Sequence, residues 1–176
     1  MKHLYILRHA KSAWDDPTLE DIDRPLNKRG RKASGVMGDY MLAEDLVPDV
    51  ILCSPSRRTR ETLERVLPIL GPDLPVRIRE VIYEASLGDL LQLVAQQDDR
   101  FQRILLIGHN PGAELLASTL ASDEAGADTD ALARMATKFP TAALAELAYD
   151  GTRWRDIRPG ALRLNRFVTP KELDPS

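Results

Sequence analysis

The chain has 176 residues, with 24 lysines and arginines against 27 aspartates and glutamates, so its formal net charge is −3. At about 150 residues per domain, this length predicts a single domain over residues 1–176 with its own hydrophobic core. Hydrophobic residues make up 43% of the chain and charged residues 29%, which excludes disordered and fibrous classes. The acidic balance argues against nucleic-acid binding, which needs a basic surface.

Composition also bears on compartment and cofactors. No apolar run approaches the ~18 residues of a membrane span, and the chain opens without the pattern of a signal peptide. The single cysteine, Cys53, has no partner for an internal disulfide, which fits a reducing compartment. We therefore expect a cytoplasmic protein with no membrane partner. The chain has only three histidines, which argues against a histidine-rich metal site, and we expect no cofactor and no metal.

The first third of the chain alternates short apolar runs with periodic segments. Residues 4–7 form a buried-strand candidate. After a polar loop, Asn27 is a candidate cap for a helix whose apolar residues recur at helical spacing over 33–41. Residues 49–53 are a second strand candidate, which ends at Ser54 and the proline after it.

The middle of the chain continues the alternation. A helix is predicted from the apolar stripe over 63–70, and Pro68 is expected to end or kink it. Residues 76–78 are a weaker strand candidate, and a third helical stripe covers 87–94. The run over 103–107 is the clearest strand of the chain, and it leads directly into a glycine and a histidine.

The last third predicts one more helix and two late strands. The helix carries apolar residues at helical spacing over 115–120, and the strands cover 142–149 and 161–168. The alternating order predicts an α/β fold, a three-layer α/β/α sandwich with a mainly parallel central sheet. In such a fold, ligands bind beyond the carboxyl ends of the strands.

Chemically capable residues follow three of these strands. Arg8 and His9 follow the first, Arg58 comes soon after the second, and His109 with Asn110 follows the run over 103–107. Taken alone, the first motif is usually a surface pair, the second is more often a solvated helix start, and the third fits a turn. Together they bring two imidazoles and two guanidiniums to one sheet edge. Buried cations without partners are costly, whereas phosphoryl oxygens match the guanidinium fork, so the sequence predicts a phosphate site.

Other phosphatase chemistries fit the sequence poorly. A cysteine-dependent phosphatase needs Cys-x5-Arg, but the sixth residue after Cys53 is Thr59, with an arginine on either side of it. We therefore interpret Cys53 as a small buried apolar residue. The acidic residues at 21–23 follow no apolar strand, as a haloacid-dehalogenase-like nucleophile would, and there is no Gly-rich P-loop.

The motifs resemble those of a known family. Arg8-His9-Ala10 resembles the Arg-His-Gly signature of the histidine phosphatase (phosphoglycerate-mutase-like) superfamily, with alanine in place of the glycine. Residues 54–62 resemble its Ser-Pro-x-x-Arg-Ala-x-Gln-Thr segment, and Gly108-His109 its second histidine motif.

Within this superfamily the chain looks most like the SixA-type phosphohistidine phosphatases. Residues 7–14 and 23–30 are similar to their N-terminal signature, and the segments around Pro140 and Trp154 are also similar. The match therefore runs nearly end to end. It implies a histidine-phosphatase-like fold over residues 1–176.

The resemblance implies a mechanism and a set of site residues. A neutral imidazole at His9 would act as the nucleophile and form a transient phosphohistidine, which water would hydrolyse without a metal. Positioning and electrostatics carry most of phosphoryl transfer. The residues expected to bind the phosphoryl oxygens are Arg8, Arg58 and His109, with Ser12, Asn110 and Lys11 as weaker candidates.

The general acid is the open assignment. Superfamily members generally use an acidic residue after the third strand, and Glu84 lies in that region, but its surroundings do not match the fuller motif. A solvated loop carboxylate explains Glu84 equally well. The leaving group of a phosphohistidine is an imidazole. Its hydrolysis therefore depends less on a general acid than the hydrolysis of an alkyl phosphate does.

The substrate remains a choice between alternatives. The compact chain lacks the long insertions of the mutases, which favours an open site for phosphohistidine on a signalling or phosphotransfer protein. The alternatives are a small-molecule phosphomonoester phosphatase or mutase on the same scaffold, and a non-catalytic phosphate-binding module. The acidic stretch at 122–130 is expected to be a solvated loop, with docking as the alternative. No motif predicts the oligomeric state.

Overall fold

The computed structural model describes residues 1–124 and 126–175. The strands are β1 (Lys2–Arg8), β2 (Val50–Cys53), β3 (Val76–Ile78), β4 (Arg103–Gly108), β5 (Leu144–Tyr149) and β6 (Arg163–Val168). The α-helices are α1 (Lys28–Ala43), α2 (Arg57–Leu70), α3 (Leu87–Ala95), α4 (Gly112–Leu120), α5 (Thr129–Thr137) and α6 (Pro170–Leu173). Short 3-10 turns are η1 (Asp21–Asp23), η2 (Glu80–Ile82) and η3 (Trp154–Asp156).

The strands form one mixed sheet in the order β3-β2-β4-β1-β5-β6. The pairs β2–β3, β2–β4 and β1–β4 are parallel, whereas β1–β5 and β5–β6 are antiparallel. The predicted α/β fold with a mainly parallel sheet is confirmed. Because β2, β4 and β1 are neighbours, the three motifs that follow them meet at one edge of the sheet.

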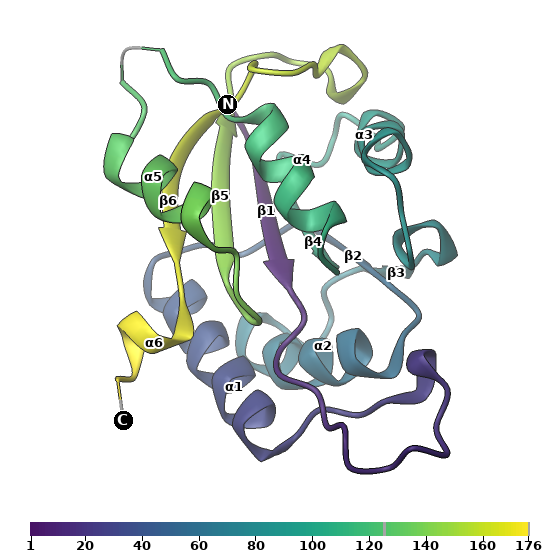
Figure 1. Ribbon diagram of the computed structural model, residues 1–176. Coiled ribbons are helices and arrows are strands. Elements are labelled where there is room, and N and C mark those ends of the chain that lie inside the picture. The colour runs from purple at the N-terminus through teal and green to yellow at the C-terminus, as the bar shows by residue number, and fades with distance from the viewer. Residues whose placement is uncertain (125, 176) are drawn as a thin grey trace.

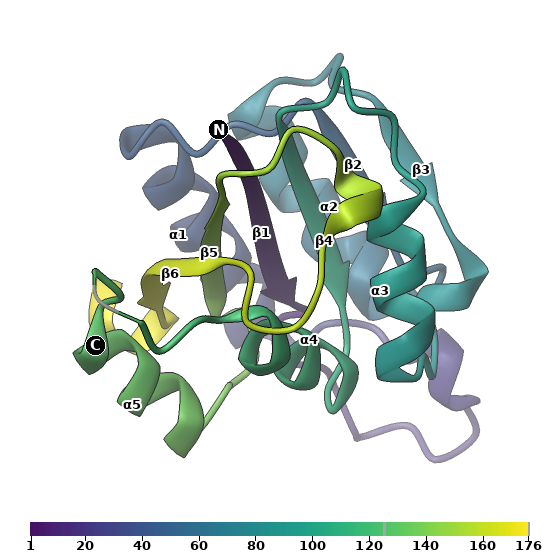
Figure 2. The same cartoon turned by 90° about the horizontal axis from the view of Figure 1, so that it is seen from above.

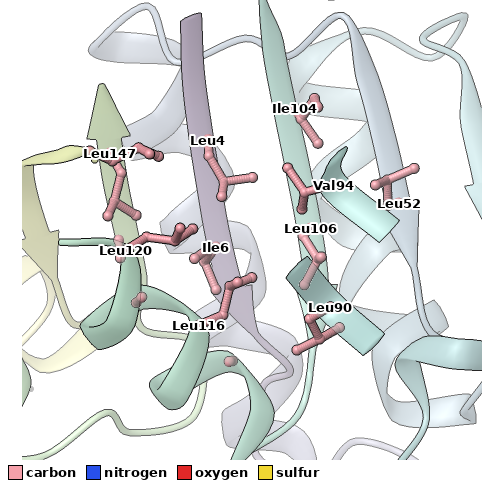
Figure 3. Packing of buried hydrophobic residues seen from close by; sticks show 14 of the residues in the cluster. Leu4, Ile6, Leu52, Leu90, Val94, Ile104, Leu106, Leu116, Leu120 and Leu147 are labelled. Carbon is pink, nitrogen blue, oxygen red and sulfur yellow. The ribbon is translucent and has the colours of Figure 1, made fainter. Parts of the chain in front are cut away.

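Helices cover both faces of this sheet (Figures 1 and 2). Alternate residues of a strand point to opposite faces, so β1 contributes Leu4 and Ile6 to one core and Tyr5 and Leu7 to the other. The first core packs under α3 and α4 (Figure 3), and α5 adds Ala131 and Met135 to it. The second packs against α1 and α2. Two buried faces hold the central strands rigidly, which fixes the positions of the residues at their ends.

Capping side chains set the helix starts that lie near the site. Asn27 accepts a hydrogen bond from the Gly30 backbone at 2.8 Å, which confirms it as the cap of α1. Ser56 caps α2 in the same way by accepting from the Thr59 backbone. Pro68 was expected to end or kink α2. The prediction that it ends the helix is wrong, because α2 continues to Leu70. Pro68 lies in the last turn, so its missing N–H removes a single helical bond there.

Two other segments differ from the sequence predictions. The stretch at 122–130 is not a loop throughout, because Asp128 caps α5 and Asp130 pairs with Arg134 at 2.8 Å within it. Ala125, in the same stretch, lies outside the described residues. The sequence predictions also lacked α5 itself and the short α6. Over the part of the chain that the structure describes, no helix is long and apolar enough to cross a membrane.

Candidate active site

The carboxyl ends of β1 and β4 and the start of α2 surround an open hollow of about 430 Å³. The four principal residues predicted from the motifs all line it, namely Arg8, His9, Arg58 and His109. The right-handed connections of the parallel strands place such a hollow at this end of the sheet. The structure therefore brings together side chains that are up to 101 positions apart, from Arg8 to His109.

His9 follows β1 and is buried, with 7% of its surface exposed. Its Nδ1 lies 2.7 Å from the backbone oxygen of Ala10. Because a carbonyl oxygen only accepts, Nδ1 carries the hydrogen and Nε2 keeps its lone pair. Burial lowers the pKa of His9 to about 3, with smaller contributions from His109, Arg58 and Arg8. His9 is therefore a neutral imidazole with a free Nε2 at neutral pH.

His109 follows β4 and faces His9, with 5.4 Å between the ring centroids. Its Nε2 lies 2.7 Å from the hydroxyl oxygen of Ser54, which follows β2. Burial and, to a smaller extent, the charge of Arg58 lower the pKa of His109 to about 4. The second imidazole is therefore also neutral, and it is oriented by a residue of the second motif.

Arg58 is buried and Arg8 is half-buried, and both are anchored to backbone oxygens. Arg8 donates from Nη1 to the oxygen of Phe139 at 3.0 Å. Burial lowers the pKa of Arg8, and the like charge of Arg58 acts in the same direction. Arg58, in the first turn of α2, donates from Nη1 to the backbone oxygen of Asp21 at 2.7 Å. Two fixed guanidiniums thus supply positive charge at one wall of the hollow.

Only Arg58 of the arginine-rich turn reaches the hollow. Arg57 forms an ion pair with Glu61 at 2.8 Å along the helix, and Arg60 donates to the backbone oxygen of Pro55 at 2.9 Å. Both are exposed, as is typical of a solvated helix start. Helix geometry therefore separates one candidate phosphate ligand from two ordinary surface residues.

Asp21, on η1, is a site residue that sequence reasoning missed. Its carboxylate accepts from Arg58 Nη2 at 3.0 Å, from Arg24 Nη1 at 3.1 Å and from the hydroxyl of Tyr83 at 2.6 Å. The Tyr83 hydrogen bond is the largest cause that lowers the pKa of Asp21 to about 2, followed by Arg58. Asp21 is therefore ionised and holds two cations, and it is not a proton donor at neutral pH.

Tyr83 completes this arrangement. Its ring meets His109 edge-on, with centroids 5.5 Å apart. Burial raises the pKa of the phenol to about 12, and its hydrogen bond to Asp21 acts in the same direction. The only available signals for Asp21 and Tyr83 were their positions near Arg24 and Glu84 in the sequence, because neither lies in a periodic segment.

Glu84 lies beside the hollow that Arg8, His9, Arg58 and His109 line, which we call the catalytic hollow. Its side chain is exposed, and its backbone has a φ of 57°, in the left-handed region. It lines an adjoining hollow of about 380 Å³, which Asp21, Arg58 and His109 also line. Its carboxylate has no hydrogen bond or ion pair with residues that the structure describes. The assignment of Glu84 as an acid stays a prediction.

The weaker candidates have structural partners. Ser12 accepts from Arg24 Nη2 at 2.7 Å, and the Asn110 amide donates to the oxygen of Phe139 at 2.9 Å. Ser12, Asn110 and Lys11 line the hollow, so a ligand there can reach them.

Cys53 is fully buried, which confirms its interpretation, and burial raises the pKa of its thiol to about 12. Within residues 1–124 and 126–175, no group of three or more His, Cys, Asp or Glu side chains is arranged to hold a metal ion.

Comparisons with known proteins agree with this geometry. A model of the histidine phosphatase superfamily (branch 1) matches residues 4–106. An uncharacterised protein from Mycobacterium tuberculosis (strain ATCC 25618 / H37Rv) is 36% identical over 165 residues, covering 94% of this chain and 100% of that one. A candidate SixA phosphohistidine phosphatase from Agrobacterium tumefaciens is 30% identical, with a TM-score of 0.78 and coverage of 96% and 98% of the two chains. The protein histidine phosphatase SixA in complex with tungstate is 23% identical, with a TM-score of 0.77 and coverage of 98% and 99%, which is a likeness of fold.

Proposed function

Since the chain belongs to the histidine phosphatase superfamily, which supports phosphatase activity, we propose that it hydrolyses phosphohistidine on a protein substrate. The observation that carries the proposal is the neutral, buried imidazole of His9, whose Nδ1 bonds to the Ala10 carbonyl 2.7 Å away. This bond leaves Nε2 free to attack a phosphorus atom in the open hollow. The likeness to SixA proteins, at 30% identity for one of them, supports the choice of substrate class.

The proposed reaction has two steps. In the first, His9 Nε2 forms a bond to phosphorus while the P–N bond of the substrate breaks, and the leaving imidazole takes up a proton from water in the open hollow. In the second, water attacks the phosphohistidine at His9, and orthophosphate leaves with restoration of the free imidazole. Arg8 and Arg58 stabilise the charge on the equatorial oxygens in both steps, and His109, whose Nε2 is held by Ser54, lines the hollow beside them.

The electrostatics of the site support a reaction without a metal. Arg8 and Arg58 are buried or half-buried cations beside His9, and Lys11 and Arg24 line the same hollow. Such groups can stabilise a transferring phosphoryl group as a metal ion does. The ionised Asp21 is the one carboxylate that lines the hollow among the described residues, and its pKa of about 2 rules it out as the acid. A phosphoramidate suits this site because its imidazole leaving group has little need of one.

The presence of Glu84 in the adjoining hollow favours one second candidate, a phosphatase for small phosphomonoesters. An alkoxide leaving group needs a proton donor, and Glu84 lines the adjoining hollow with no hydrogen bond or ion pair to residues that the structure describes. On this account, Glu84→Gln impairs alkyl phosphate turnover more than phosphohistidine turnover. Equal losses on the two substrates would contradict this role for Glu84.

The deciding experiment is phosphate release from a phosphohistidine-bearing phosphotransfer protein, with a chelator present. Wild-type protein should release phosphate, and His9→Ala should lose at least about a thousandfold in rate, as nucleophile variants do. His3→Ala is the matched control, because His3 lies at the start of β1, away from the hollow. Turnover of sugar phosphates without turnover of the phosphohistidine protein would contradict the substrate assignment. Binding of phosphate without release by wild-type protein would indicate a non-catalytic module.

A further inference from the structure

Two further hollows adjoin the catalytic hollow in turn through shared lining residues. The first measures about 480 Å³ and shares Lys11, Lys138, Pro140 and Thr141 with the catalytic hollow. The second measures about 420 Å³ and shares four residues with the first, Lys171 among them. We call these two hollows together the trough. It is continuous with the site because each hollow shares walls with the next.

The elements that form the trough come from distant parts of the sequence. The start of α1 lies beside α6, and both lie near the end of β6 (Figure 1). The first hollow of the trough has an apolar floor that includes Ala33, Pro140 and Phe167. Figure 1 also shows this region at the end of the sheet where β1 leads into the site.

The rim of the trough carries unneutralised positive charge. Lys11, Arg29, Lys138 and Lys171 line it, are exposed, and form no ion pair within the described part of the chain. The two side-chain carboxylates that line the trough among the described residues are already paired, because Glu172 lies 3.0 Å from Arg134 and Asp174 lies 3.2 Å from Lys32. The trough therefore presents a net excess of cations that a ligand could neutralise.

We infer that the trough binds an acidic segment of the phosphorylated protein, with apolar residues between its carboxylates. This inference rests on the proposed function and adds the chemistry of the partner's surface. A single phosphoryl group needs only the catalytic hollow, whereas the two further hollows, which share walls in turn, offer room for a stretch of polypeptide. The cationic rim complements aspartates and glutamates, and the apolar floor complements the side chains between them.

The test uses two phosphohistidine peptides that differ only in their flanking segment. One carries glutamates and leucines beside the phosphohistidine, and the other has glutamine in place of each glutamate. Free phosphohistidine serves as a substrate too short to reach the trough. At low salt, kcat/KM of the wild-type protein should be about tenfold higher for the glutamate peptide, the sum of several exposed ion contacts. The preference should shrink at high salt.

The informative variant is the double substitution Arg29→Gln with Lys171→Gln, because both residues lie outside the catalytic hollow. It should reduce the preference for the glutamate peptide about fivefold and leave turnover of free phosphohistidine unchanged. The matched control is Arg155→Gln with Arg158→Gln, which removes the same charge. Those residues are exposed on and beside η3, which packs through Trp154 against Phe101 at the opposite end of β1. The control should keep the full preference.

A binding measurement separates failure of the trough from failure of the proposed function. Fluorescence anisotropy follows the same two peptides, labelled and without phosphate, so no turnover is needed. Tighter binding of the glutamate peptide, weakened by the trough variant alone, supports the inference even if phosphohistidine is not hydrolysed. Equal binding of both peptides, or equal weakening by the two double variants, would overturn it.

Two further measurements distinguish other occupants of the trough. If fructose 1,6-bisphosphate bound in an Arg29- and Lys171-dependent manner and the glutamate peptide did not, the trough would be a site for small polyanions. Sedimentation velocity reports self-association. A dimer that the trough variant abolishes would assign the trough to a second copy of the chain and overturn the inference.

Discussion

Asp21 holds both terminal nitrogens of Arg58, one through its backbone oxygen at 2.7 Å and one through a carboxylate oxygen at 3.0 Å. The same carboxylate accepts from Tyr83 and Arg24. Because a carboxylate and a phosphoryl group are both anions, Asp21 orients Arg58 and also competes with the phosphoryl group for its charge. Orientation of Arg58 favours turnover, whereas competition for its charge weakens binding of the phosphoryl group. Kinetic measurements can therefore separate the two effects.

We predict that Asp21→Asn splits binding from turnover. Removal of the negative charge should tighten inhibition by inorganic phosphate about fivefold, the scale of one partly exposed charge interaction. The kcat for phosphohistidine should fall about tenfold, because Arg58 and Tyr83 lose a charged hydrogen-bond partner. Steady-state kinetics with phosphate as a competitive inhibitor measures both quantities.

The control for this prediction is Asp23→Asn on the same 3-10 turn. Asp23 is exposed and does not line the catalytic hollow. It should leave both constants within about twofold of wild type, because an isolated exposed charge contributes little. If Asp21→Asn weakened phosphate inhibition and lowered kcat together, Asp21 would have a purely structural role.

The site residues that follow strands could be predicted, whereas those on irregular segments could not. Arg8, His9 and His109 directly follow apolar runs, and the topology of parallel strands places them together. Asp21 lies in a segment whose conformation depends on tertiary contacts, such as the Arg24 bond to Ser12 at 2.7 Å. No local pattern encodes such contacts, so a site carboxylate in this segment was not predicted.

At the scale of elements, the start of α1 supports the segment that follows His9. The backbone N–H of Asn27 donates to the Lys11 oxygen at 3.0 Å, and a Cβ added at Gly30 would overlap that same oxygen. The close approach of helix and loop therefore requires a residue without a side chain at this position. Lys11 and Ser12, on this loop, line the catalytic hollow.

We predict that Gly30→Ala destabilises the protein by about 2 kcal/mol, because the backbone at Lys11 must move to admit a methyl group. Phosphate release should fall with it, since the loop carries part of the site wall. Gly35→Ala on the same helix is the matched control, because nothing lies within 4 Å of the added Cβ. That change should stabilise the protein by about 0.5 to 1 kcal/mol through helix propensity. Urea unfolding of the two variants checks this, and equal effects would contradict it.

The elements that the sequence predicted are those with a strong period or a clear cap. Asn27 and the stripe over 33–41 identified α1, and the apolar run over 103–107 identified β4. In contrast, α5 was missed because its only buried residues are Ala131 and Met135, a weak stripe within an acidic stretch. Pro68 does not end α2, because a proline near a helix end removes one bond without breaking the helix.

At the scale of the whole molecule, the two site histidines link activity to stability. His9 and His109 have pKa values lowered to about 3 and about 4, from an ordinary value of 6.5, mainly by burial. Between pH 6.5 and 4 the unfolded chain therefore binds more protons than the folded one. The contribution of the two neutral histidines to the free energy of unfolding is therefore fully present above pH 6.5. It is lost as the pH falls from 6.5 toward the pKa values of the folded state. The lowered pKa of Asp21, about 2, acts only below pH 4.

We predict that the free energy of unfolding falls steeply from pH 7 to pH 5, and that the double variant His9→Gln with His109→Gln flattens this fall. Each histidine should account for about 2 kcal/mol of the loss by pH 5, since one pKa unit corresponds to about 1.4 kcal/mol. Urea unfolding at each pH measures it, and the ¹³Cε1 shifts of both rings in the folded wild type should not titrate above pH 5. Parallel pH dependence of the wild type and the variant would contradict the prediction.

A neutral His9 at pH 5 keeps the free Nε2 that the proposed nucleophile requires. The burial that lowers stability in acid therefore also preserves the nucleophilicity of His9 over the physiological pH range.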